Sequence, residues 1–293
     1  MRPSIDFSGL WIPLVTPFHD GLVDHTALTR LVKRYAPTGV AGFVVCGSTG
    51  EAASLDEAEQ LAVLDTVLAA SDERPLIMGL SGYNLPQTLA WVRALCSHPG
   101  AARLAGLLVP APHYIRPSQA GLLGWFKAIA NQAACPVVVY DIPQRTGVTL
   151  APDTLLALAH HPNIRAVKDC GHDAAKTQAL IADGRLQILA GEDQQMFTTM
   201  ALGGVGAIAA SAHLHTEQFV DMVRLLRQGD LTQARALWAP LVPVIDALFA
   251  EPNPASIKAA LASEGWLQNE LRPPMVAARL PARDGREKSH FGG

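Results

Sequence analysis

The chain has 293 residues, 49% of them apolar and only 17% charged, so it is long enough for one large or two small domains and much of it is expected to be interior. A formal net charge of −3 argues against nucleic acid as a main partner, because no basic excess exists to neutralise phosphates. No apolar run reaches membrane-spanning length and no signal-peptide core is visible, so we expect a cytoplasmic protein with no membrane partner.

Apolar runs of strand length alternate with stretches of helical periodicity along the chain. Strands are predicted at 10–16, 42–46, 75–81, 106–112, 136–143, 164–170, 186–193 and 205–212. Helices are predicted after them at 25–36, 56–70, 85–97, 118–134, 152–161, 173–184, 194–204 and 216–229. The strands are mostly apolar rather than alternating, which indicates burial on both faces and a parallel sheet. Eight such units predict a (β/α)8 TIM barrel, with a doubly wound open sheet as the alternative.

The pattern changes after residue 229. Two further helical stretches follow with no strand between them, and the last residues are polar. We therefore predict a catalytic barrel over 1–229, an appendage of additional C-terminal helices over 230–278, and a disordered tail over 279–293.

One lysine stands at the end of a predicted buried strand. Apolar residues at 164, 166 and 167 draw the strand inward, and Lys168 follows them at its carboxyl end. Burial of its stem would disfavour the ammonium, lower its pKa and supply a neutral amine as a nucleophile. The alternative is an ordinary lysine that reaches the surface at a strand end.

Other strand ends carry groups that such a lysine would use. The run Gly47-Ser48-Thr49-Gly50-Glu51 can hold a carboxylate or phosphate with its hydroxyls and backbone N–H groups, or it is a glycine turn that caps a helix. Tyr114 and Tyr140 can exchange protons, and Arg145 can clamp a carboxylate. Together these residue types suit Schiff-base chemistry on a carboxylated ketone.

Competing motifs are weaker. His213-Leu214-His215 with Glu192 and Asp193 lacks the spacing of a known zinc motif, so no metal site is predicted. Ser48 is not in a G-x-S-x-G elbow, which argues against a serine hydrolase.

The motifs form an ordered series between about residues 10 and 275: GSTGE at 47–51, HYIRPSQ at 113–119, YDIPQRTG at 140–147, VKD at 167–169, AGED at 190–193, GGVGAI at 203–208, EPNP at 251–254 and LRPPM at 271–275. This series resembles the class I pyruvate-dependent aldolase and lyase family typified by dihydrodipicolinate synthase and N-acetylneuraminate lyase. The resemblance implies a TIM barrel that assembles as a homotetramer, a dimer of dimers, and needs no metal or organic cofactor.

The resemblance also implies residue roles. Lys168 matches the lysine that forms a Schiff base with pyruvate, and Tyr140 matches the general acid and base. Ser48 and Tyr114 match a proton relay, with Tyr114 shared across the tight dimer. The implied substrate-binding residues are Thr49 with Ser48 for the pyruvate carboxylate, Arg145 for a second carboxylate, and Gly191 and Ile208 for the pocket wall.

The implied reaction condenses pyruvate with a small aldehyde, aspartate semialdehyde, to 4-hydroxy-tetrahydrodipicolinate in lysine and diaminopimelate biosynthesis. Arg145 favours this synthase branch, whereas Ser48, Asp141 and Asp169 stand where synthases usually carry threonine, asparagine and glutamate. One alternative is another pyruvate-dependent aldolase or dehydratase, acting on a 2-keto-3-deoxy sugar acid or a substrate like N-acetylneuraminate. A second is a non-catalytic regulator that binds a small molecule on the same scaffold. Glu57 and Gln60 replace histidines of lysine-inhibited synthases, so lysine feedback is left open.

Overall fold

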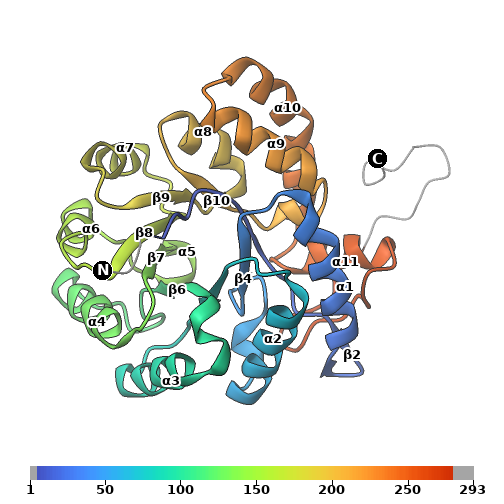
Figure 1. Ribbon diagram of the computed structural model, residues 1–293, viewed down its shortest axis with the longest axis horizontal. Helices are drawn as coiled ribbons and strands as arrows, with labels where there is room; N and C mark the ends of the chain where they lie inside the picture. Colours follow the sequence, from blue (N-terminus) through green and yellow to red (C-terminus); the bar gives the residue numbers. More distant parts are fainter. Residues whose placement is uncertain (1–4, 280–293) are drawn as a thin grey trace.

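The computed structural model describes residues 5–279. Within that range eight parallel strands close into a barrel in the order β1-β10-β9-β8-β7-β6-β5-β4 (Figure 1). These strands are β1 (Gly9–Pro13), β4 (Gly42–Val45), β5 (Leu76–Gly79), β6 (Leu104–Pro110), β7 (Val137–Asp141), β8 (Ile164–Asp169), β9 (Gln187–Ala190) and β10 (Gly206–Ile208). The predicted TIM barrel is confirmed, and the open-sheet alternative is wrong.

Helices form a ring around the barrel (Figure 1). The ring helices are α1 (His25–Tyr35), α2 (Glu57–Ala70), α3 (Leu85–Ser97), α4 (Gln119–Gln132), α6 (Pro152–Leu158), α7 (Ala174–Asp183), α8 (Met196–Ala201) and α9 (Thr216–Arg227). The additional C-terminal helices are α10 (Leu231–Leu248) and α11 (Ala255–Ser263). Residues 280–293, most of the predicted tail, lie outside the described residues.

The strands are mostly apolar because each of them packs on two sides. Trp11, Val44 and Ile77 belong to a cluster inside the barrel. Their neighbours in sequence, such as Ile12 and Phe43, belong to a larger cluster between the strands and the helices. Successive side chains of a strand point to opposite faces. A strand that is buried on both faces therefore lacks the alternation of apolar and polar residues that a half-exposed strand shows.

Helix starts follow the local sequence closely. Asp56 caps α2 by accepting from the backbone N–H of Glu59, whose side chain in turn accepts from the Asp56 N–H. Ser118 accepts from the backbone N–H of Gly121 at the start of α4. Such caps satisfy N–H groups that have no partner within the helix. These starts were therefore predictable.

Strand ends and short elements were less predictable. The first strand was expected over 10–16 but β1 ends at Pro13, because the loop beyond it is as apolar and buried as the strand. The hairpin of β2 (Phe18–His19) and β3 (Leu22–Val23) and the one-turn helix α5 (Pro143–Thr146) were not predicted. Periodicity carries little information over two to four residues.

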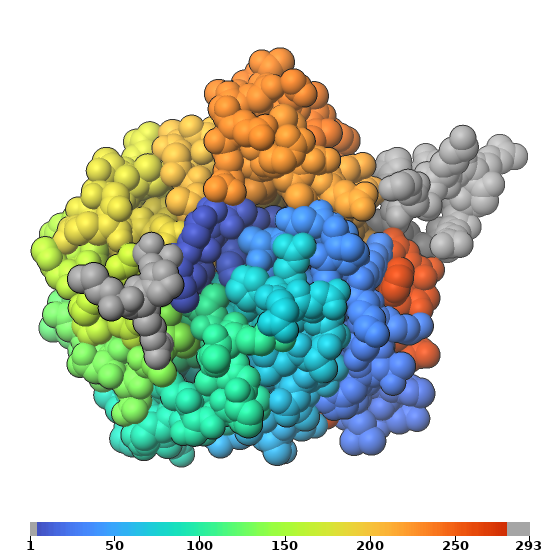
Figure 2. All heavy atoms as spheres, viewed as in Figure 1, coloured from blue at the N-terminus to red at the C-terminus, as the bar shows by residue number. Residues whose placement is uncertain are grey.

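The C-terminal helices give the molecule its asymmetric outline. In Figure 2 the atoms around α10, in orange, form a ridge that projects beyond the rounded barrel. The segment that contains α11 lies against α1, where Arg34 pairs with Glu264 at 3.0 Å and stacks over the Trp266 ring. Among the described helices none is both long and apolar enough to cross a membrane.

His213 is a buried histidine that the fold keeps neutral. Its Nε2 accepts from the Val15 N–H at 3.2 Å and its Nδ1 lies 2.8 Å from the Ala210 carbonyl oxygen. Burial lowers its pKa from 6.5 to about 4. The residue is thus part of the core, next to the Tyr35 ring.

We predict that His213 makes the fold sensitive to acid. Between pH 6.5 and 4 the unfolded chain binds a proton at this residue that the folded chain does not, so the free energy of unfolding falls by about 3 kcal/mol as the pH drops through that window. Urea unfolding at several pH values measures the change. In a His213→Asn variant the same window is expected to show a correspondingly smaller loss; equal losses in both proteins would contradict the prediction.

Candidate active site

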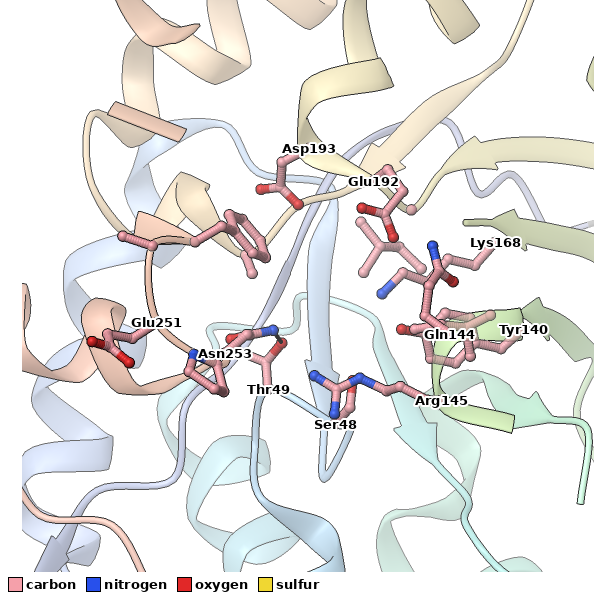
Figure 3. Close-up of a pocket in the computed structure, with 17 residues that line it drawn as sticks. Ser48, Thr49, Tyr140, Gln144, Arg145, Lys168, Glu192, Asp193, Glu251 and Asn253 are labelled. Atoms are coloured by element: carbon pink, nitrogen blue, oxygen red, sulfur yellow. Dashed lines mark hydrogen bonds between the residues drawn. The ribbon is translucent and has the colours of Figure 1, made fainter. Parts of the chain in front are cut away.

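Side-chain alternation along two neighbouring strands positions the candidate nucleophile. Val138 in β7 and Ala166 in β8 face the inside of the barrel, and two residues further on Tyr140 and Lys168 face the same side. Tyr140 and Lys168 are also opposite each other in the strand register. The Lys168 Nζ lies 4.3 Å from the centre of the Tyr140 ring. Figure 3 shows both side chains pointing into one cavity.

The cavity has a volume of about 480 Å³. It is lined by most of the predicted site residues: Ser48, Thr49, Tyr140, Arg145, Lys168, Gly191 and Ile208. The structure thus brings these residues together, from the ends of several strands, where barrel enzymes place their active sites.

Tyr114 is the predicted site residue that the structure leaves out of this cavity. It follows β6 in a loop, with a left-handed backbone (φ +73°) and 86% of its surface exposed. One chain therefore does not direct this tyrosine to its own Lys168.

The pKa of Lys168 is raised, and the expected lowering is wrong. Burial by itself lowers this pKa, but Tyr140, Cys170 and Asp193 raise it by more, because their ionised forms favour the ammonium. Burial also raises the pKa of Tyr140, and Lys168 opposes that effect. Tyr140 and Asp193 lie on other strands and loops, so the local sequence around Lys168 could not show their effect. A neutral Lys168 amine requires the Lys168–Tyr140 pair to lose a proton.

Five polar residues of the cavity wall were not among the predicted site residues: Gln144, Glu192, Asp193, Glu251 and Asn253. The Asn253 Nδ2 donates to the Thr49 Oγ1 at 3.1 Å, and its buried Oδ1 has no partner among the described residues. Asp193 is a buried carboxylate that accepts from the Ser211 N–H at 2.7 Å and from the Ser211 hydroxyl. Asn253 belongs to the EPNP motif and Asp193 to the AGED motif, but the sequence alone does not show that these motifs lie close to Lys168.

The loop that carries Ser48 and Thr49 is held from the C-terminal end of the chain. Glu51 closes this loop with a left-handed backbone (φ +53°) and forms an ion pair with Lys258 of α11. It also accepts from the Arg272 N–H at 3.3 Å. Burial lowers the pKa of Lys258 to about 8 and raises the pKa of Glu51. The alternative that 47–51 is only a turn that caps a helix leaves this anchoring unexplained.

A second cavity of about 320 Å³ adjoins the first. The two share Ser48, Tyr140 and Arg145 in their walls. The wall of the second also contains His113, whose ring meets the Tyr83 ring edge-on at a centroid distance of 5.2 Å. Ser48, Tyr140 and Arg145 therefore lie between the two cavities.

The arrangement combines a buried amine, an adjacent phenol, hydroxyl groups and a guanidinium around one enclosed space. An amine and a phenol in contact can form and dehydrate a carbinolamine, and the hydroxyls and guanidinium can bind carboxylates. These groups suit imine chemistry on a keto acid.

The whole chain can now be compared with known proteins. The family model described as the dihydrodipicolinate synthetase family matches residues 6–289. The chain belongs to this family. The resemblance found in the motifs is thereby confirmed over nearly the full length of the sequence.

Several dihydrodipicolinate synthetase family members are similar along their whole length. The 4-hydroxy-tetrahydrodipicolinate synthase 2 of Clostridium acetobutylicum is 36% identical over 92% of this chain and 94% of that protein. The 4-hydroxy-tetrahydrodipicolinate synthase of Sorangium cellulosum is 38% identical over 94% and 92%. The crystal structure of the chloride-inhibited dihydrodipicolinate synthase from Acinetobacter baumannii, complexed with pyruvate, superposes with a TM-score of 0.89 at 29% identity, covering 94% of each chain.

Gly191 gives a test of how tightly the site is packed. An added Cβ would lie 2.4 Å from the Cys170 Sγ and 2.8 Å from the Lys168 Cγ. We therefore predict that Gly191→Ala lowers the free energy of unfolding by about 1–3 kcal/mol, because the core around Lys168 is overpacked. Denaturant unfolding measures this loss.

The matched control is Gly124→Ala. Gly124 lies on α4, where an added Cβ would meet nothing within 4 Å. This variant is expected to gain about 0.5–1 kcal/mol from the better helix propensity of alanine. Equal stabilities of the two variants would show that the space next to Lys168 is not needed.

Proposed function

We propose that this chain is a class I, Schiff-base-forming lyase that condenses pyruvate with aspartate semialdehyde to 4-hydroxy-tetrahydrodipicolinate. The observation that carries the proposal is the contact between the buried Lys168 amine and the Tyr140 ring, in a cavity that also holds Ser48, Thr49 and Arg145. The names of the similar proteins support the choice of reaction. The lysine and diaminopimelate pathway and a cytoplasmic location follow as predictions.

The first half of the proposed reaction forms an imine. The neutral Lys168 amine attacks the ketone carbon of pyruvate, while the pyruvate carboxylate accepts hydrogen bonds at Ser48 and Thr49. Tyr140 gives a proton to the carbinolamine oxygen, which leaves as water. The resulting iminium draws electrons from the methyl group, so a base can remove a methyl proton and leave an enamine.

The second half forms a carbon–carbon bond. The enamine carbon attacks the aldehyde of aspartate semialdehyde, and the aldehyde oxygen takes a proton from Tyr140. Arg145 holds the carboxylate of this second substrate, as a planar guanidinium is suited to do. The substrate amine then attacks the iminium carbon, closes the ring and expels Lys168 as a free amine.

Tyr114 enters the proposal through a second subunit. It lies next to His113 of the second cavity and belongs to an exposed apolar patch with Tyr83, 56% exposed, and Ile115, 52% exposed. In a two-fold dimer the same patch contacts itself, so Tyr114 of the partner subunit would come close to this cavity and to Ser48. We propose this pairing as the tight dimer of a homotetramer.

We predict that borohydride traps pyruvate on Lys168. Reduction of the iminium leaves a stable secondary amine, which mass spectrometry of peptides locates. A Lys168→Met variant is expected to give no adduct, since methionine keeps the length of the side chain but has no amine. Trapping at another lysine would refute the role of Lys168, and no adduct at all in the natural protein would end the class I assignment and favour a non-catalytic binding protein.

We predict that Arg145 selects a carboxylated acceptor. An Arg145→Met variant is expected to keep imine formation with pyruvate but to lose about a hundredfold in kcat/KM for aspartate semialdehyde, because a charge-assisted bidentate contact is removed. Steady-state kinetics with a panel of aldehydes and 2-keto-3-deoxy acids measures this. A sugar-like aldehyde or sugar acid as the best substrate would assign the chain to another pyruvate-dependent aldolase or dehydratase.

A further inference from the structure

A buried ion cluster lies directly behind the candidate nucleophile. The Lys176 ammonium, on α7, is 2.5 Å from the Asp141 Oδ2 and 3.9 Å from the Asp169 Oδ1, and all three side chains are buried. Two carboxylates and one ammonium in an apolar layer are costly unless every group is paired. Such a cluster therefore needs an explanation.

The two carboxylates follow the two central site residues in sequence. Asp141 comes after Tyr140 and Asp169 comes after Lys168, and the two aspartates are opposite each other in the strand register. Because side chains alternate along a strand, Tyr140 and Lys168 face the cavity while the aspartates face the helix layer and Lys176. A shift of either strand end would move a site residue and an aspartate together.

Neighbouring atoms surround the Lys176 ammonium closely and leave it no room to move. An added Cβ at Gly171 would lie 2.2 Å from the Lys176 Nζ and 3.0 Å from the Asp141 Oδ2. The other two carboxylate oxygens also have hydrogen-bond donors. The Asp141 Oδ1 accepts from the Leu150 N–H at 3.3 Å, and the Asp169 Oδ2 accepts from the Thr177 hydroxyl at 2.6 Å. The surroundings of Lys176 are thus packed as closely as those of Lys168.

We propose that Lys176 is a positioning residue: it ties the ends of β7 and β8 together and offsets one of the two carboxylate charges behind Lys168 and Tyr140. The proposal rests on the function given above. On the cavity side Lys168 faces Tyr140, Cys170 and Asp193. Lys176 acts from the opposite side and touches neither substrate.

The test measures the Lys168 amine in two ways. Competitive labelling with acetic anhydride over a pH range, read by mass spectrometry, gives the pKa of Lys168 without any substrate. Borohydride trapping after timed mixing with pyruvate gives the rate of imine formation. The variants are Lys176→Met, Asp141→Asn and the double variant, with Lys127→Met on the exposed face of α4 as control.

We expect Asp141→Asn to lower the pKa of Lys168 by about one unit, because a neighbouring negative charge is lost while the ammonium stays. Lys176→Met is expected to slow imine formation by about tenfold to a hundredfold, because the paired strand ends lose their tie. The double variant is expected to restore the pKa of Lys168 towards that of the natural protein, since the net charge of the cluster is again that of one carboxylate. Imine formation stays slow in it, because the tie between the strand ends is still missing. Lys127→Met is expected to change neither.

The outcomes separate this proposal from the proposed function. Absence of any pyruvate adduct in the natural protein would refute the function, while the labelling experiment still reports on the cluster. If Lys176 is purely structural, Lys176→Met lowers the melting temperature but leaves the rate of imine formation unchanged. Asp141→Asn then leaves the pKa of Lys168 unchanged as well. Those results would overturn the proposal. If Lys176→Met does not fold, Asp141→Asn and the double variant decide through the Lys168 pKa.

Discussion

The register between β7 and β8 is the constraint on which the site depends. One pairing places Tyr140 beside Lys168 on the inner face, and the next places Asp141 beside Asp169 on the outer face. Because side chains alternate along a strand, Tyr140 and Lys168 face the cavity, whereas the two aspartates face the helix layer. A slip of one residue in either strand would bury the amine in the helix layer and turn a carboxylate into the cavity.

The charges of the site are distributed over several elements, and this determines the behaviour of its lysine. Burial alone would favour a neutral amine, but Tyr140, Cys170 and Asp193 reverse the direction of the pKa shift. The amine and the phenol are therefore better understood as one proton-holding unit than as a nucleophile and a separate base. Asp141 and Asp169 stand where the resemblance implies asparagine and glutamate, and they are the two positions that Lys176 joins. The two aspartates are therefore coupled in space and are opposite each other in the strand register, although they lie 28 positions apart in the sequence.

Much of the architecture could be predicted from sequence because most barrel strands are apolar runs and several helix starts have a cap such as Asp56 or Ser118. Site residues that follow strand ends, Lys168 and Tyr140 among them, could be predicted for the same reason. Asn253 and Lys258 could not, because they act through contacts more than 200 residues away in sequence that no local pattern encodes. Tyr114 was predicted from the resemblance, and its exposure in the single chain shows why residue patterns alone could not place it.

The anchoring of the loop that carries Ser48 and Thr49 has a consequence for the order in which the molecule is built. Glu51 meets Arg272 across 221 positions, and Thr49 meets Asn253 across 204. A chain that emerges from the ribosome N-terminus first acquires these contacts after all eight strands have been made, and it must close a very long loop to do so. The barrel can therefore be largely assembled while its binding loop still lacks its anchors. Reactivity towards a keto acid would then be the last property to appear during synthesis, later than the fold itself.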